Sequence, residues 1–166
     1  MPDLPVRKNI RLEGYDYSQA GCYFVTICVK GGHELLWEQA LVGARIARPL
    51  SSIGEAAKRA IENISVAYQA VHVDKYTIMP NHIHMILCLK NNECITEKNP
   101  GRALCAPTIS TVINQFKGSV TKQIGFSIWQ KSYHDRIIRD ESEYQKIWQY
   151  IDQNPAHWQD DCYYTK

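Results

Sequence analysis

Two histidines, His82 and His84, stand one residue apart in an apolar run that is typical of a β-strand. Side chains alternate between the faces of a strand, so both imidazoles are predicted to point the same way and Ile83 the opposite way. Neutral imidazole is the commonest metal ligand in proteins. The pair could therefore hold one metal ion, although the same pattern also occurs in structural or surface histidine pairs.

Tyr150 lies on a predicted C-terminal helix, outside the apolar stripe that the helix buries. That stripe comprises Tyr144, Ile147, Trp148 and Ile151. At about 100° per residue, Tyr150 sits roughly 110° from the centre of the stripe. Asn154 follows one turn later, so its amide oxygen can lie beside the Tyr150 hydroxyl as a neutral ligand or a phosphate partner. A half-exposed structural tyrosine fits the same pattern.

A second tyrosine, Tyr133, is also a candidate for a chemical role. Tyr133 stands next to His134, and a tyrosine beside a histidine resembles a nucleophile with its base. Its predicted strand gives Tyr133 no amide partner four residues later. Tyr150 is therefore the preferred candidate.

The strands that must position these groups are marked by β-branched and aromatic residues. They are predicted over residues 22–29, 71–78, 82–89 and 129–138. Met79-Pro80-Asn81 is predicted to form a turn, because proline cannot donate into a strand ladder and asparagine tolerates unusual backbone angles. The second and third strands therefore form a hairpin with His82 and His84 on its second arm.

Three helices are predicted from their capping residues. They begin at the Ser52-x-x-Glu55 capping box, at Thr108 and at Asp140, and Gly125 ends the second. The order of elements predicts an α+β, ferredoxin-like split β-α-β fold. It has an antiparallel sheet with helices on one face, plus a C-terminal helix that carries Tyr150.

The length of 166 residues predicts one domain over 1–166, with an N-terminal extension over 1–19 and a loop over 90–107. No run approaches the ~18 apolar residues of a membrane helix, and no apolar signal core is found, so we expect a cytoplasmic protein without a membrane partner. The six cysteines include no C-x-x-C pair and are expected to be reduced thiols, with a disulfide or a zinc-ribbon site as the less favoured alternatives. A net charge of +2 neither requires nor excludes nucleic acid.

Several ordered motifs resemble the REP-associated tyrosine transposases, relatives of the insertion-sequence transposases of the single-tyrosine HUH class. The motifs are Gly14-Tyr15-Asp16-Tyr17-Ser18, Met79-Pro80-Asn81-His82-Ile83-His84, Phe116-Lys117, Trp129-Gln130-Lys131-Ser132-Tyr133 and Tyr150-Ile151-Asp152-Gln153-Asn154-Pro155. The likeness runs from about Arg11 to about Trp158, and several motifs in order are more specific than any one alone.

The resemblance implies that His82 and His84 are metal ligands, that Tyr150 is the nucleophile and that Asn154 is the third ligand. It implies a metal-dependent single-stranded DNA endonuclease and strand transferase that acts on hairpin-containing DNA, such as REP-like elements, through a 5′-phosphotyrosine intermediate. The family suggests Mg²⁺ or Mn²⁺, and Zn²⁺ is a less favoured choice. A monomer is slightly favoured over a homodimer.

Cationic side chains are candidates for phosphate contacts, provided that they gather on one face. They are Arg45, Arg48, Lys117, Lys122, Lys131 and Arg136.

Other functions stay open at this point. A ferredoxin-like protein descended from such a transposase could bind nucleic acid without cutting it. An unrelated metalloenzyme, such as a hydrolase, could use His82 and His84 with a carboxylate. Cys88 is predicted to share the face of His82, so its thiolate could join a zinc site there.

Overall fold

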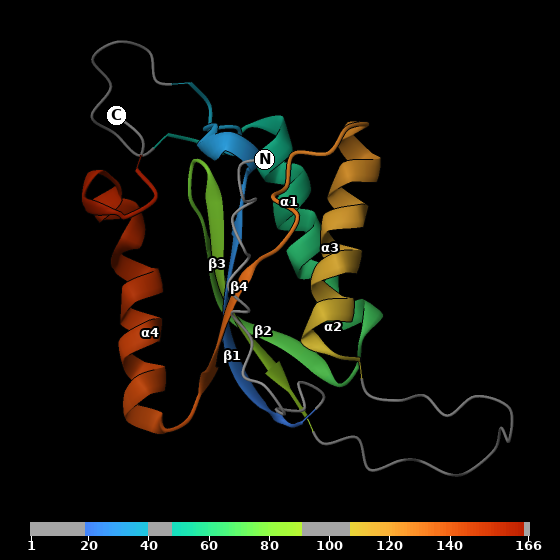
Figure 1. Cartoon of the computed structure of the whole chain (residues 1–166), viewed down its shortest axis with the longest axis vertical. Helices are drawn as coiled ribbons and strands as arrows, with labels where there is room; N and C mark the ends of the chain where they lie inside the picture. The colour runs from blue at the N-terminus through green and yellow to red at the C-terminus, as the bar shows by residue number, and fades with distance from the viewer. Residues whose placement is uncertain (1–18, 40–47, 91–106, 165–166) are drawn as a thin grey trace, which may run out of the picture.

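The computed structural model describes residues 19–39, 48–90 and 107–164, and it contains a four-stranded antiparallel sheet between two layers of helices (Figure 1). The strands are β1 (Gly21–Cys28), β2 (Val71–Ile78), β3 (His82–Leu89) and β4 (His134–Ile138). Their order in the sheet is β2-β3-β1-β4. This confirms the predicted ferredoxin-like α+β fold. Residues 1–18 and 91–106, and with them most of the predicted extension and loop, lie outside the described residues.

The helices cover both faces of the sheet (Figure 1). One face carries α1 (Ser52–Glu62), the short α2 (Ile64–Ala67) and α3 (Ile109–Ile124). The other carries α4 (Glu141–Gln153), which continues into the 3-10 helix η2 (Asn154–Asp160). A further 3-10 turn, η1 (Lys30–Gly32), follows β1. Within the described residues, no helix has both the length and the apolarity to cross a membrane.

Each face of the sheet has its own apolar core because side chains alternate along β1 and β3. Odd-numbered residues, such as Val25 and Met85, pack with α1 and α3. Even-numbered residues, such as Ile86 and Cys88, pack with Ile151 of α4. All eight residues of β3 are therefore buried. His82 and His84 are even-numbered, so the prediction that they share one face is confirmed.

Two predicted element boundaries are wrong. Ser51, not Ser52, caps α1, and its hydroxyl accepts from the Gly54 amide. The predicted strand over 129–138 forms only from His134, while Trp129 makes an isolated bridge. The Val29–Trp129 bridge is two residues out of register with the Thr26–His134 pair, so the segment between them bulges out of the ladder. Within this segment the Lys117 ammonium binds the backbone carbonyls at residues 130 and 132.

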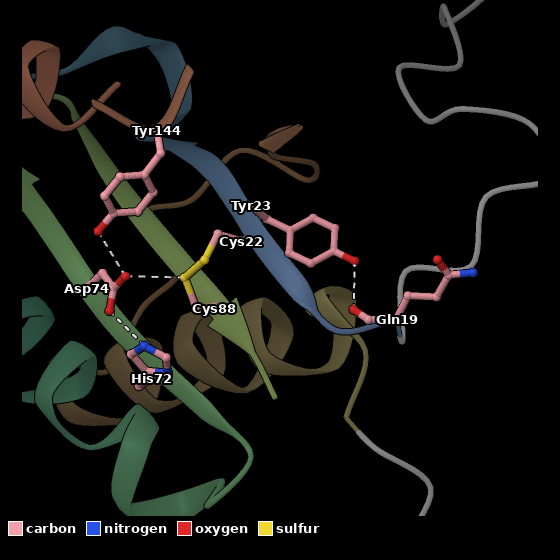
Figure 2. The surroundings of a disulfide bond; sticks show 7 residues. All are labelled: Gln19, Cys22, Tyr23, His72, Asp74, Cys88 and Tyr144. Atoms are coloured by element: carbon pink, nitrogen blue, oxygen red, sulfur yellow. Dashed lines mark hydrogen bonds and ion pairs between the residues drawn. A yellow bond between two sulfur atoms is a disulfide. The ribbon is translucent and has the colours of Figure 1, made fainter. Parts of the chain in front are cut away.

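The prediction that all six cysteines are reduced is also wrong. Cys22 and Cys88 form a disulfide, and they are directly opposite partners on β1 and β3 with Cα atoms 4.1 Å apart (Figure 2). Facing positions of an antiparallel pair bring side chains into contact, whatever their distance in sequence. Of the other cysteines in the described segments, Cys28 and Cys162 are free.

Candidate active site

The imidazoles of His82 and His84 meet on the α4 side of β3, with their Nε2 atoms 2.9 Å apart. The two residues are 0% and 1% exposed. Burial lowers the pKa of His82 to about 4, although the charge of Asp161 opposes this shift. Burial, and then the neighbouring His82, lower the pKa of His84 to about 2. Both rings are therefore neutral near pH 7, which is the form that binds metals.

Asn81 fixes the tautomer of His82. Its Nδ2 donates to the carbonyl oxygens of Gly32, at 3.2 Å, and Tyr163, at 2.8 Å. Because a carbonyl only accepts, Oδ1 must be the Asn81 atom that faces His82 Nδ1, at 2.9 Å. His82 Nδ1 therefore carries the proton, and His82 Nε2 presents a lone pair to the cluster.

Thr26 leaves the tautomer of His84 free to change. Its hydroxyl lies 2.8 Å from His84 Nδ1, and a hydroxyl can donate or accept. Since His82 Nε2 has only a lone pair, the contact between the two Nε2 atoms is a hydrogen bond when His84 Nε2 carries the proton. A metal ion at Nε2 needs the other tautomer, which rotation of the Thr26 hydroxyl permits.

The Tyr150 hydroxyl reaches this cluster from α4, 3.2 Å from His84 Nε2. Phe24 helps to orient both rings, since it stacks on His84 and meets Tyr150 edge-on. Tyr150 is still 42% exposed, so a substrate can approach it. Burial, and then the charge of Asp161, raise the pKa of Tyr150 to about 12. Without a nearby cation, this phenol is neutral near pH 7.

Asp161 is a member of the cluster that sequence reasoning missed. Its Oδ2 lies 3.9 Å from His82 Nε2 and 3.5 Å from the Tyr150 hydroxyl. The ligand atoms of His82, His84 and Asp161 all lie within 4.8 Å of one another. Nothing in the local sequence separates Asp161 from the neighbouring Asp160. Its position depends on η2, which returns the chain over His82, as the contact of the Trp158 and His82 rings indicates.

Asn154, the predicted third ligand, begins η2 one turn after Tyr150 and is 4% exposed. Both polar atoms of its side chain are buried without a hydrogen-bond partner among the described residues. Its amide opposes the rise in the pKa of Tyr150, so it lies near the hydroxyl, although without a hydrogen bond of ordinary geometry. An unpaired buried amide is costly, so its oxygen suits a ligand role.

A pocket of about 330 Å³ opens beside the cluster. Its lining includes Cys28, Asn81, Gln130 and Tyr163. The Tyr163 ring also packs against His82, with ring centroids 4.5 Å apart. The pocket is therefore continuous with the residues that surround the imidazole pair.

Two of the predicted phosphate-binding cations lie on α3, across the sheet from Tyr150 (Figure 1). Lys117 donates to the carbonyls of Gln130 and Ser132, both at 2.9 Å. Burial lowers the pKa of Lys117 to about 8, and the charge of Cys28 opposes this shift. Lys122 is exposed on the same helix.

The remaining predicted cations are also dispersed. Arg48 pairs with Glu34 at 2.8 Å, and Arg136 of β4 pairs with Glu143 of α4. Lys131 is exposed in the bend before β4, and Arg45 lies outside the described residues. The cations within the described residues therefore do not gather around the imidazole pair, and their role in DNA binding stays a prediction.

The two rival groups lie elsewhere. Tyr133 packs against the core on the α1 and α3 side of the sheet, and its hydroxyl is 3.2 Å from Ser110 Oγ. Cys88 shares the face of His82, as predicted, but it is bonded to Cys22 and grouped with Asp74. The structure therefore brings His82, His84 and Tyr150 together and leaves both rivals apart from them.

Comparisons with known proteins agree with the fold. No model of a known protein family matches the chain. An uncharacterized protein of Haemophilus influenzae is 33% identical over 175 residues, which cover 96% of this chain and 93% of that protein. A solved structure of a REP-associated tyrosine transposase bound to a REP hairpin is similar with a TM-score of 0.62 and 19% identity, covering 87% of this chain and 72% of that one. At 19% identity, the structural similarity shows that the two chains share a fold. This confirms the fold that the resemblance to the REP-associated tyrosine transposases implied.

Proposed function

We propose that this chain, which belongs to the same family as the Haemophilus influenzae protein, is a metal-dependent enzyme that cuts and rejoins single-stranded DNA through Tyr150. The observation that carries the proposal is the 3.2 Å separation of the Tyr150 hydroxyl from His84 Nε2, within a cluster that also holds His82 and Asp161. The fold shared with the REP-associated tyrosine transposase supports it. Tyr150 and the histidines of one chain already meet, so a monomer is sufficient.

The side chains of the cluster fit a divalent cation. His82 and His84 would hold it through Nε2, and either Asn154 Oδ1 or the Asp161 carboxylate would add an oxygen ligand. A bound ion supplies positive charge that polarises a phosphate oxygen and lowers the pKa of a neighbouring phenol. We propose Mg²⁺ or Mn²⁺, because the transposase family that the motifs resemble suggests these ions. Zn²⁺ is the less favoured choice, although it accepts two imidazoles and a carboxylate.

Tyr150 attacks a backbone phosphorus of the DNA in this proposal. The bond from the tyrosine oxygen to phosphorus forms, and the bond from phosphorus to the 3′ oxygen breaks. Asp161, the acceptor of a 3.5 Å contact from the Tyr150 hydroxyl, takes the phenolic proton and returns it to the leaving 3′ oxygen. The products are a 5′-phosphotyrosine and a free 3′-hydroxyl. Another 3′-hydroxyl can reverse the attack without ATP, because the phosphodiester is retained.

The pocket beside the cluster can receive a base next to the cleaved phosphate. Tyr163 offers an aromatic ring there, and bases stack on aromatic side chains with little dependence on sequence. Single-stranded DNA is therefore the proposed substrate, and the fold shared with a transposase solved on a REP hairpin supports a hairpin beside the single strand.

The test is covalent capture of DNA. The protein is incubated with Mn²⁺ and hairpin-containing single strands from the flanks of its own gene, and the adduct is mapped by peptide mass. We expect a nucleotide on Tyr150, none on the Tyr150→Phe variant, and a normal yield for the matched Tyr133→Phe control. Oligonucleotides that are bound but stay intact with Mg²⁺, Mn²⁺ and Zn²⁺ would instead support a nucleic-acid-binding protein without nuclease activity.

Asp161 favours a second candidate function, a metal-dependent hydrolase in which water is the nucleophile. Two imidazoles, a carboxylate and an open position are the ligand set of several hydrolytic zinc sites. This function predicts cleavage that survives Tyr150→Phe, is lost in Asp161→Asn and leaves no DNA on the protein. The covalent adduct therefore separates the two candidates.

A further inference from the structure

A second group of metal-ligating side chains lies on the α4 side of the sheet (Figure 2). Cys22, Cys88 and Asp74 each offer one ligand atom, and these atoms lie within 4.8 Å of one another. Cys88 is four residues after His84 on β3, about 13 Å away along the strand. The group is therefore separate from the Tyr150 cluster.

The sheet builds this group from one cross-strand row and a bulge. His72 of β2, Cys88 of β3 and Cys22 of β1 are consecutive partners across three strands. The β2 register shifts between Val73 and Lys75, so Asp74 has no partner on β3. A bulge of this kind re-aims a side chain, and here it turns the Asp74 carboxylate toward the sulfur pair.

Neighbouring side chains hold the Asp74 carboxylate in this position. Its Oδ1 lies 2.7 Å from His72 Nε2, and its Oδ2 accepts a hydrogen bond of 2.9 Å from the Tyr144 hydroxyl (Figure 2). A ligating carboxylate is typically fixed by hydrogen bonds of this sort. Tyr144 belongs to α4, so the carboxylate is anchored from the helix as well as from the sheet.

The Asp74 carboxylate faces the disulfide without a hydrogen bond between them. Asp74 Oδ2 lies 3.4 Å from Cys88 Sγ, but a disulfide sulfur carries no proton to donate. Reduction would give Cys88 a thiol proton for this oxygen. Loss of the protons would leave two thiolates facing a carboxylate, an arrangement that needs a cation between them.

We propose that the reduced Cys22 and Cys88, together with Asp74, form a zinc site. Two thiolates and a carboxylate oxygen are ligands that Zn²⁺ accepts. Sulfurs on a tetrahedral zinc lie roughly 3.8 Å apart, given Zn–S bonds of about 2.3 Å. The Cα atoms of Cys22 and Cys88 are 4.1 Å apart, and once the disulfide is reduced, rotation of the side chains about their Cα–Cβ bonds can give the sulfurs that separation.

Reduction and metal binding are two separate steps. A dithiol reductant gives two electrons, so the Cys22–Cys88 bond breaks, the reductant forms its own disulfide, and its two protons pass to the cysteine sulfurs. Each thiol then releases its proton as Zn²⁺ binds. The ion can enter from solvent, because Cys22 is partly exposed and the Asp74 side chain is 27% exposed.

Cobalt provides the test, because Co²⁺ occupies zinc sites and gives a near-ultraviolet charge-transfer band only with sulfur ligands. The protein carries His82→Gln and His84→Gln to remove the other cluster, is reduced with a dithiol, and is desalted without oxygen. We expect one equivalent of Co²⁺ with this band, its displacement by Zn²⁺, and no band before reduction. A reduced protein without the band would overturn the proposal.

Matched variants assign the band to these residues. Cys88→Ser should abolish it, whereas Cys28→Ser, which changes a free buried thiol, should leave it intact. Asp74→Asn should weaken Co²⁺ binding on the order of tenfold or more while the band remains. A band that survives Cys88→Ser, or an unchanged affinity in Asp74→Asn, would overturn the assignment. If Cys88→Ser does not fold, as judged by circular dichroism, the Asp74→Asn result decides.

Discussion

Replacing Asn81 with alanine should weaken metal binding at His82 while leaving the metal-binding nitrogens in place. The Asn81 side chain donates to the carbonyls of Gly32 and Tyr163 and accepts from His82 Nδ1. Alanine removes all three bonds, so the His82 ring is no longer held in one tautomer and orientation. Loss of such an orienting partner typically weakens metal affinity by about 10–100-fold, or roughly 1.4–2.8 kcal/mol.

The same variant should also lower the free energy of unfolding. One buried and two partly buried hydrogen bonds are lost at a net cost of about 0.5–1.5 kcal/mol each, which gives roughly 1.5–4.5 kcal/mol in total. Asn81→Asp separates the two effects. Its carboxylate still accepts from His82 Nδ1 but cannot donate to Gly32 or Tyr163, so stability should fall by roughly 1–3 kcal/mol, the cost of two of the three bonds, while most of the metal affinity remains.

The measurements are Mn²⁺ titration calorimetry on chelator-treated protein and urea unfolding followed by fluorescence. Asn114→Ala is the matched control, because Asn114 is exposed on α3, and it should match the wild type in both. Wild-type Mn²⁺ affinity in Asn81→Ala would refute the reasoning that Asn81 orients His82. Equal affinity losses in Asn81→Ala and Asn81→Asp would show that the accepting oxygen has no special role.

Acidifying the metal-free protein from pH 7 to about 4 should destabilise it, because the unfolded chain protonates His82 and His84 below about 6.5 while the fold holds their pKa values at about 4 and about 2. The free energy of unfolding should fall by at most about 3 kcal/mol per imidazole at pH 4. The urea midpoint should depend less on pH across this range in a His82→Gln, His84→Gln variant. Gly54→Ala should cost roughly 1–3 kcal/mol in urea unfolding, since a Cβ there collides with the Leu36 carbonyl oxygen. Gly118→Ala, where a Cβ meets nothing within 4 Å, should instead be neutral or stabilising.

The sequence predicts elements well where local signals determine them. The bounds of β2 and β3 match the predicted runs, and α3 has the predicted Thr108 cap and the left-handed Gly125. These features depend on residues within a few positions of one another. The start of β4 was missed because it depends on pairing with β1 and the residue that follows it, where the Val29–Trp129 bridge and the Thr26–His134 pair are two residues out of register.

In the candidate site, too, the sequence predicts the features that local patterns determine and not those that depend on distant contacts. Strand periodicity predicts the direction of His82 and His84, and helix periodicity predicts that Tyr150 leaves the buried stripe. Their meeting depends on how α4 packs against β3, which periodicity does not specify. Asp161 lies in the imidazole cluster because η2 turns the chain back over His82. Cys22 and Cys88 are 66 residues apart in sequence and meet because their strands pair. Contacts between distant residues of this kind leave no local pattern.

The site and the core are specified together because both are built on β3. Its odd-numbered side chains fill the core under α1 and α3, while its even-numbered side chains carry the two imidazoles and Cys88. A slip of one residue against β1 would turn His84 into the apolar core and move it away from its partner Thr26. Burying an imidazole without a hydrogen-bond partner costs about 1–3 kcal/mol, so the chemistry itself disfavours the wrong register. The residues that serve the proposed reaction therefore also help to select the fold that brings them together.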